Sequence, residues 1–493
     1  MANHKLKLLF PLAVVALAAC ATPKPATESA GAPAQGEGDE KFQKFLHQCR
    51  DSYADVDARI AKAGVHDATY YQVPGFPYVR TDRLMSSYRG EVSGDINTLG
   101  TWMLQLREND SIARDIELAN MGMPKYERAD LLNSLRTCAV WLTFAELADP
   151  PTLARLIDAV QIPEPPAPAE QKTVVQELSA RRAKILAEFS GPLPRPSVPL
   201  TNWQVKQPPP DPNLPHGFSQ VARDELGRIG LLMNQWPELA AQNAPQLLIE
   251  TGGDYDRLGT PILTAGGPSV DTSKPVVYYL PSYARVGSRT LVQINYIFWF
   301  SARPPGREGD LEAGALDGRI WRVTLGDDGK ALAYDTIRAS GFDHLWFPDR
   351  SLAPRADVAD AEPPLVPQTQ IPQGGVALRL QSATHDLRRL IRSKDTQVAE
   401  TRRYELRPYE DLMTLPAPSG GTRSLFDPSG VVPGSERPAN PLYRAAGVAQ
   451  AGAMRQWGNH ETALLGRRYF DDPRLIEELF VMSPPATEHA RLP

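Results

Sequence analysis

The stretch LVQINYIFWF (residues 291–300) decides the fold class of this chain. Most of its residues are β-branched or aromatic, and such residues favour β-strands. Val276–Leu280 has a similar composition, and Ile320–Leu325 and Ala331–Ile337 flank GDDG (residues 326–329), which predicts a β-hairpin. Further strand candidates are Val376–Leu380 and Tyr404–Arg407. This run of strands predicts an antiparallel sheet.

Helical patterns lie on both sides of the strand-rich region. Those before it cover about Lys41–Lys62, Asp95–Arg107, Ser111–Asn120, Glu127–Leu147 and Ala169–Ser190, and those after it about Ala445–Gln456 and Pro473–Phe480. Runs of strands with helices before and after are typical of α+β proteins. The sequence therefore predicts an α+β fold, in which an N-terminal helical domain is followed by a mainly antiparallel β-sheet domain with C-terminal helices.

Proline marks the expected domain boundary. The chain has 47 prolines among 493 residues, nearly twice the average share of about 5%, and they gather in linker-like segments. We expect a signal peptide at residues 1–19, a lipidated cysteine with a disordered tether at 20–40, and a helical domain at 41–191. A Pro-rich linker at 192–216 and an α+β domain at 217–493 complete the predicted organisation.

The first twenty residues have the architecture of a secretory signal. The apolar run Leu8–Ala19 is too short for a membrane span, which needs about 20 residues. Its end, LAAC (residues 17–20), resembles the lipobox of bacterial lipoproteins, and the alternative is an ordinary signal. The resemblance implies that Cys20 becomes the mature N-terminus and carries lipid chains such as palmitate. Ala21 stands where inner-membrane lipoproteins typically carry Asp, which implies the outer membrane, facing the periplasm.

The charge balance bears on the partners of this chain. Its 53 basic and 58 acidic residues give a net charge of −5, which is not the basic footprint of a nucleic-acid-binding protein. We therefore expect attachment to a membrane through the lipid anchor at Cys20, an envelope protein or the cell wall as a partner, and no nucleic acid.

Two cysteines remain after the signal, and both lie on apolar stripes of predicted helices. Cys49 follows Phe42, Phe45 and Leu46 at helical spacing, and Cys138 lies on a second helix. An even pair of cysteines in an oxidising compartment predicts a disulfide between the two helices. The alternative is a pair of buried free thiols, because cysteine also packs well as a small apolar residue.

Signatures of well-known catalytic classes are missing from the sequence. It has no G-x-S-x-G, no H-E-x-x-H, no C-x-x-C and no Walker loop, and we expect neither a cofactor nor a metal. Two clusters remain as candidate catalytic sites: Asp343 with His344, and His460 with Glu461. Adjacent imidazole and carboxyl groups can act in acid–base chemistry. The alternative is that each cluster is an ordinary polar segment packed against neighbouring aromatic residues.

The body of the chain resembles envelope lipoproteins of proteobacteria that are themselves uncharacterised. The resemblance lies in LDGRIWRVTL (residues 316–325) and in Arg455–Gly466, and it implies no particular activity. Two classes of function follow from the sequence. The first is a non-catalytic binding or structural component anchored to the membrane and facing the periplasm. The second is a periplasmic enzyme, metal-dependent or hydrolytic, that uses His344 and His460.

Overall fold

The computed structural model describes most of the chain after the predicted signal. The described residues are 35–162, 171–207, 211, 214–306, 308–341, 343–358, 363–372, 375–392, 397–438, 452–462 and 468–482. The predicted signal peptide and Cys20 lie outside them. The chain divides into two units, Met1–Phe45 and Leu46–Pro493. All contacts discussed below lie within the second unit.

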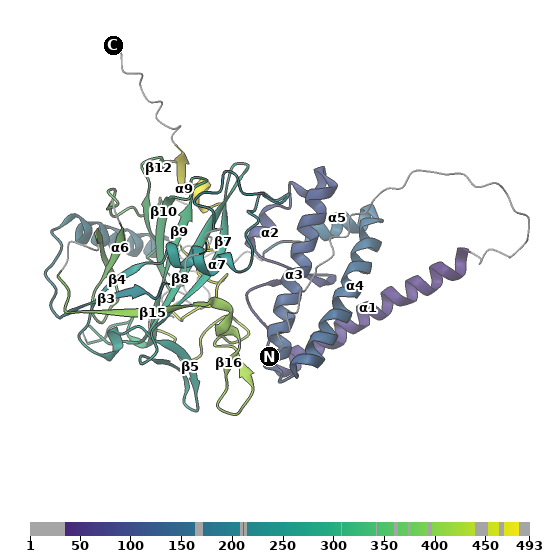
Figure 1. Ribbon diagram of the computed structural model, residues 1–493, viewed down its shortest axis with the longest axis horizontal. Helices are drawn as coiled ribbons and strands as arrows, with labels where there is room; N and C mark the ends of the chain where they lie inside the picture. Colours follow the sequence, from purple (N-terminus) through teal and green to yellow (C-terminus); the bar gives the residue numbers. More distant parts are fainter. Residues whose placement is uncertain are drawn as a thin grey trace, which may run out of the picture. The chain divides into compact units, whose positions relative to one another are not determined.

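Helices come first along the chain, as predicted (Figure 1). They are α1 (Gln35–Ala63), α2 (Arg83–Ser87), η1 (Val92–Gly94), α3 (Ile96–Asn120), α4 (Lys125–Leu147), α5 (Pro150–Ala159) and α6 (Gln171–Ser190). A short hairpin of β1 (Tyr71–Val73) and β2 (Phe76–Thr81) lies between α1 and α2. Helix α1 begins inside the segment predicted as a tether.

Helix α3 is one continuous helix where the sequence predicts two. Asp95 caps its start, because the Asp95 carboxylate accepts a hydrogen bond from the Thr98 N–H at 2.8 Å. Asp110 lies buried within the helix and accepts hydrogen bonds from Arg80 and Arg114. These partners satisfy a side chain that would otherwise favour a helix end.

A ten-stranded mixed sheet follows, with the strand order β11-β10-β9-β8-β7-β15-β3-β4-β13-β14. Its strands are β3 (Leu200–Val205), β4 (Gln246–Glu250), β7 (Val276–Val286), β8 (Arg289–Arg303), β9 (Gly314–Leu325), β10 (Ala331–Arg338), β11 (Leu345–Pro348), β13 (Val376–Leu380), β14 (Leu387–Arg392) and β15 (Glu400–Pro408). Most neighbouring strands are antiparallel, as predicted. Strand β15 pairs in parallel with both β7 and β3, and β13 pairs in parallel with β4.

Smaller elements surround this sheet. They are η2 (Asp254–Asp256), the hairpin of β5 (Thr260–Thr264) and β6 (Gly267–Asp271), α7 (Gln235–Gln242), η5 (Tyr409–Met413), the pair β16 (Leu415–Pro416) and β17 (Thr422–Arg423), the pair β12 (Leu352–Pro354) and β18 (Phe480–Met482), and α9 (Leu475–Leu479). The α+β fold class is therefore confirmed, with helices first and a mainly antiparallel sheet after them.

Strand β8 explains why the deciding stretch is almost continuously apolar. Alternate side chains of a strand point to opposite faces of the sheet. Ile294, Tyr296 and Phe298 belong to one hydrophobic core, whereas Ile297 and Trp299 belong to a second. Because both faces of β8 are buried, the strand has no polar face for the sequence to reveal. The GDDG turn joins β9 to β10 in the predicted hairpin.

Three segments differ from the sequence expectations. Strand β3 lies in the middle of the sheet, although its residues fall within the predicted linker 192–216. Helix α6 falls within the predicted helical domain, yet its Phe189 packs into the core of the sheet. The predicted helix Ala445–Gln456 is wrong over residues 452–456, where the Met454 carbonyl accepts a hydrogen bond from the Val432 N–H, and its earlier part lies outside the described residues. Strand β3 was not predicted because it is short and prolines lie on both sides of it in the sequence.

The disulfide between Cys49 and Cys138 is confirmed. It joins α1 to α4, with 5.3 Å between the two Cα atoms and 89 positions between the residues in the sequence. Tyr53 adds a second link, because its hydroxyl donates to the Leu135 carbonyl at 2.9 Å. Among the described residues, none of the helices combines the length and the apolar character needed to cross a membrane.

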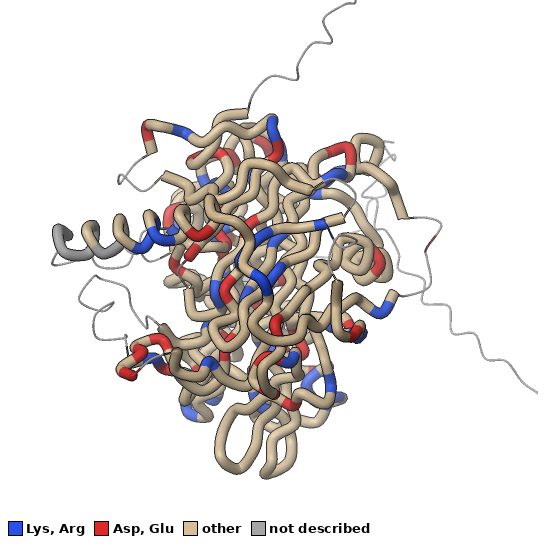
Figure 2. Tube along the Cα trace, turned by 90° about the vertical axis from the view of Figure 1, so that its left-hand side faces the viewer, with Lys and Arg blue, Asp and Glu red and all other residues tan. Residues whose placement is uncertain are grey.

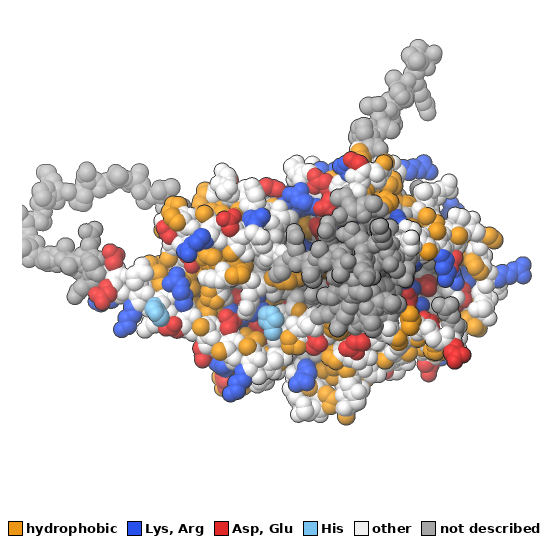
Figure 3. Space-filling view, turned by 180° about the vertical axis from the view of Figure 1, so that it is seen from behind, with side chains coloured by type: hydrophobic (Ala, Val, Ile, Leu, Met, Phe, Trp, Pro, Cys, Tyr) orange, Lys and Arg blue, Asp and Glu red, His pale blue; other side chains and the backbone are white. Residues whose placement is uncertain are grey.

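Charged and apolar side chains are mixed over the surfaces in view. In Figure 2, basic and acidic positions are dispersed along a trace that consists mostly of other residues. On the face in Figure 3, hydrophobic side chains lie scattered among polar and charged ones where grey atoms do not cover them. The described part of the face in Figure 3 is therefore chemically mixed.

Candidate functional site

Asp343, a predicted catalytic residue, lies in a network of ion pairs. Its two carboxylate oxygens accept hydrogen bonds from Arg181 of α6 at 2.5 Å each, and Arg338 of β10 lies 3.0 Å away. Burial alone would raise the pKa of Asp343, but the two arginines outweigh burial and lower it. A carboxylate that is paired in this way is a poor proton acceptor, and it fastens α6 to the end of the sheet.

His344, its neighbour in the chain, is buried, with 8% of its surface exposed. Its Nε2 lies 2.7 Å from the carboxylate of Asp335, which also forms an ion pair with Arg322. The ring packs against Trp346, with 4.6 Å between the ring centroids, and against Phe470. Burial lowers the pKa of His344. These contacts are those of a packed core histidine.

His460 and Glu461, the second predicted cluster, are also buried. Neither ring nitrogen of His460 has a hydrogen-bond partner of normal geometry among the described residues. Burial, and to a smaller extent the nearby Arg455 guanidinium, lower the pKa of His460 to about 3. Glu461 pairs with Arg455 at 3.1 Å, and burial raises its pKa.

The structure brings the two clusters near each other through Phe470. The Phe470 ring packs on His344, and the Phe470 N–H donates to the backbone carbonyl of His460 at 2.8 Å. Phe470 belongs to a hydrophobic core. The two predicted clusters therefore meet across packed aromatic and apolar side chains.

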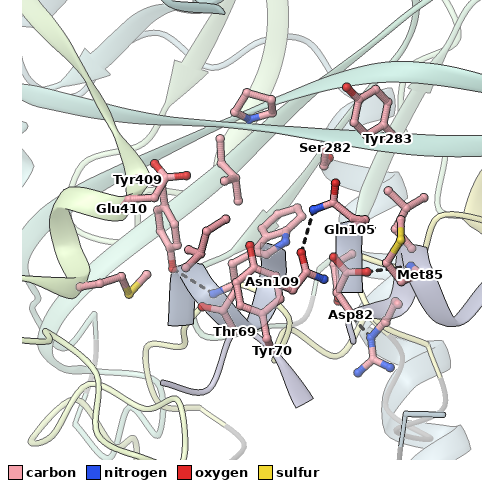
Figure 4. A pocket seen from close by; sticks show the side chains of 18 of the residues that line it. Thr69, Tyr70, Asp82, Met85, Gln105, Asn109, Ser282, Tyr283, Tyr409 and Glu410 are labelled. Carbon is pink, nitrogen blue, oxygen red and sulfur yellow. Dashed lines mark hydrogen bonds and ion pairs between the residues drawn. The ribbon is translucent and has the colours of Figure 1, made fainter. Parts of the chain in front are cut away.

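A cavity of about 200 Å³ lies elsewhere, where the helical region meets strand β7. Its walls come from the segment before β1, from α2, α3, β7 and η5, and from the segment around Trp457 (Figure 4). We call it the Asn109 pocket, after a buried residue of α3 that lines it. Among the residues that line the pocket are the polar residues Asp82, Gln105, Asn109, Arg228 and Glu410 and the aromatic residues Tyr70, Tyr283, Tyr409 and Trp457.

A chain of hydrogen bonds fixes how Asn109 faces this pocket. Arg228 donates to the Gln105 Oε1 at 2.5 Å, so the Gln105 amide must present its Nε2 group on the other side. That Nε2 donates to the Asn109 Oδ1 at 2.9 Å. The Nδ2 of Asn109, a residue only 1% exposed, is then left without a partner among the described residues.

A buried N–H donor without a partner is costly, by roughly 1–3 kcal/mol. Natural proteins keep few such groups, and each one calls for an explanation in function or in bound solvent. Asn109 lines a cavity, and a ligand oxygen that reached its Nδ2 from there would accept this hydrogen bond. Asn109 is therefore the residue that most strongly marks the pocket as a binding site.

Asp82 supplies an acidic group to the same pocket. Its Oδ1 accepts a hydrogen bond from the Met85 N–H at 2.7 Å and thereby caps α2. Burial raises the pKa of Asp82. The carboxylate forms no ion pair with any described residue.

The sequence gives almost no signal for this pocket. Its residues are scattered from Thr69 to Asp471, and no two of them form a recognisable motif. The one weak signal is the position of Asn109 and Asp110 inside a helix, because such residues favour helix ends. Across the residues that the structure describes, no cluster of His, Cys, Asp and Glu is arranged to hold a metal ion.

Comparisons with known proteins add no further guidance, since no family model, no curated protein and no solved structure matches this chain.

Proposed function

We propose that this chain is a membrane-anchored envelope lipoprotein that faces the periplasm, and that its body is a non-catalytic binding component whose ligand occupies the Asn109 pocket. The observation that carries the proposal is the unpartnered, oriented Asn109 amide in a cavity lined by polar and aromatic side chains. Pockets with a few convergent polar groups among apolar walls are typical of ligand sites.

The anchor rests on the lipobox-like residues 17–20 and on Cys20 in particular. The disulfide between Cys49 and Cys138 supports an oxidising compartment such as the periplasm. Cys20→Ser should abolish incorporation of a labelled fatty acid in cells, whereas Cys49→Ser should leave it unchanged. Continued labelling of the Cys20 variant would contradict the anchor.

In this proposal His344 and His460 have structural roles. His344 holds the buried carboxylate of Asp335, and the depressed pKa of His460 keeps its ring neutral at the pH of the periplasm. Neither ring is needed for binding in the Asn109 pocket. Their substitution should therefore change stability and leave the affinity of the folded protein for its ligand unaltered.

The binding function can be tested by thermal unfolding in the presence of a library of amines, sugars, amino acids and nucleosides. A ligand present at 100 times its Kd stabilises the folded state by about 2.7 kcal/mol. At least one compound class should raise the Tm of the wild type and fail to raise that of Asn109→Asp, which replaces the donor with an acceptor.

Asn120→Asp is the matched control. Asn120 lies on the same helix α3 and its Nδ2 donates to the Met413 carbonyl at 2.9 Å, but Asn120 does not line the Asn109 pocket. This variant should respond to the ligand as the wild type does. The binding proposal fails if no compound raises the Tm, or if Asn109→Asp responds as strongly as Asn120→Asp.

A further inference from the structure

We propose that the ligand of the Asn109 pocket carries a protonated amine and, close to it, a neutral oxygen acceptor such as a hydroxyl or an amide carbonyl. This inference rests on the proposed binding function and names the ligand class. It follows from the charges of the pocket, from its aromatic walls and from the unpartnered Nδ2 group of Asn109.

The pocket has a surplus of negative charge. Both arginines that line it are already paired: Arg83 lies 3.2 Å from Asp471, and Arg228 lies 2.7 Å from Asp224. Two other lining carboxylates, Asp82 and Glu410, have no ion-pair partner among the described residues. A cation in the pocket would meet two carboxylates that form no ion pair with a described residue, whereas an anion would meet arginines that are each paired with a carboxylate.

Asp82 is the stronger anchor for a cation. One of its oxygens accepts the Met85 N–H, and the other makes no hydrogen bond with a described residue. Burial raises its pKa, because the loss of water outweighs the Met85 hydrogen bond and the more weakly interacting Arg228 guanidinium. Glu410 is exposed at the rim, where its carboxylate can attract a cation from solvent.

Aromatic rings line the space between these acids. Tyr70, Tyr283, Tyr409 and Trp457 all border the pocket, and Figure 4 shows Tyr70 and Tyr409 between Glu410 on one side and Asp82 on the other. The faces of tyrosine and tryptophan rings attract cations. The walls therefore favour an ammonium group over a neutral polar group of similar size.

The Asn109 Nδ2 defines the second half of the ligand. A donor requires an acceptor oxygen, and Asn109 lines the same cavity as Asp82. The ligand must therefore offer its oxygen close to its amine, within a cavity of about 200 Å³. A carboxylate would place a negative charge beside Asp82, so the oxygen is a neutral one.

Amino sugars and the amides of amino acids both have this chemistry. Glucosamine and L-alaninamide are the two probes. The counterpart of glucosamine is N-acetylglucosamine, which lacks the charged amine. The counterpart of L-alaninamide is L-alanine, which has a carboxylate in place of the amide. Isothermal titration of the purified full-length protein should give a Kd for at least one of the two amines that is about tenfold or more tighter than for its counterpart, a difference of about 1.4 kcal/mol. The amine that binds more tightly identifies the source of the ligand.

Asp82→Asn tests the ion pair while it keeps a capping side chain on α2. It should weaken binding of the preferred amine about tenfold or more. Asp95→Asn is the matched control, because Asp95 caps α3 through the same kind of hydrogen bond and lies outside the pocket. Asp95→Asn should leave the Kd unchanged.

Two results would overturn the ligand class. One is binding of N-acetylglucosamine or L-alanine as tight as that of the corresponding amine, and the other is an unchanged Kd in Asp82→Asn. If neither amine binds but another compound stabilises the wild type and not Asn109→Asp, the ligand class is wrong and the binding function stands. If no compound in the library binds at all, the proposed function itself fails.

Discussion

The pH dependence of stability gives a quantitative test of the role of His460. Its pKa is about 3 in the folded protein, because the ring is buried beside Arg455, and 6.5 when unperturbed. Between these values the unfolded chain binds a proton that the folded chain does not. Stability from this group is therefore fully present above pH 6.5 and is lost as the pH falls below it.

The expected size follows from the linkage relation. Well between these two values each pH unit changes the free energy of unfolding by about 1.36 kcal/mol, so lowering the pH from about 8 to about 5 should cost the wild type about 2 kcal/mol through this residue. His460→Asn lacks the titrating group and should not show this loss. Other groups titrate alike in both proteins, so the difference between the two pH profiles isolates His460.

Urea unfolding followed by tryptophan fluorescence at both pH values measures this difference. His47→Asn is the control, because His47 is an exposed surface residue on α1 and its variant should keep the pH profile of the wild type. If His460→Asn and the wild type lose equal stability on acidification, the ring is not buried and neutral as described. That result would restore His460 as a candidate acid–base group.

Three other substitutions test contacts that hold the fold. Replacing Cys49 and Cys138 together by Ala removes a cross-link between residues 89 apart and should lower the free energy of unfolding by about 4.6 kcal/mol in the chain-entropy model; an unchanged urea midpoint would contradict it. Burial alone would raise the pKa of Glu117, but hydrogen bonds from His66 and Arg80 lower it to about 2, so its contribution is present above pH 4.5 and is lost as the pH falls toward 2. Glu117→Gln replaces one of the two carboxylate oxygens that accept from the fully buried Arg80 at 2.7 Å with an NH2 group, while the contact with Asp110 remains; it should cost about 1–3 kcal/mol at pH 7, and wild-type stability at pH 7 would refute this. His344→Ala removes the 2.7 Å contact to Asp335 and the packing on Trp346 and should cost about 2 kcal/mol in thermal unfolding; a loss of ligand affinity without a loss of stability would instead place His344 in a binding site.

Local patterns predicted much of the fold. The β8 stretch, the GDDG turn and the apolar stripes around Cys49 and Cys138 each depend on near neighbours in the chain, and the structure confirms all three. Strand β15 could not be placed in this way, because its insertion between β7 and β3 depends on pairings with residues far away in the sequence.

The candidate site could not be predicted from local sequence patterns either, because it also depends on contacts between residues far apart in the sequence. Asp343 and His344 resemble an acid–base pair in the sequence, but their partners Arg181 and Asp335 become visible only in three dimensions. The orientation of Asn109 depends on Arg228, which lies more than a hundred positions away. Function therefore depends here on contacts between distant segments, which a single sequence does not reveal.

The affinity of the Asn109→Asp variant for the best ligand of the wild type shows whether the Asn109 amide takes part in binding. Titration calorimetry on this variant, on Asn120→Asp and on the wild type would give three Kd values under one set of conditions. We predict that Asn109→Asp binds about tenfold or more weakly, because an acceptor replaces the donor that the ligand oxygen needs. Equal Kd values in all three proteins would show that the Asn109 amide does not contact the ligand, and they would contradict the proposed binding site in the Asn109 pocket.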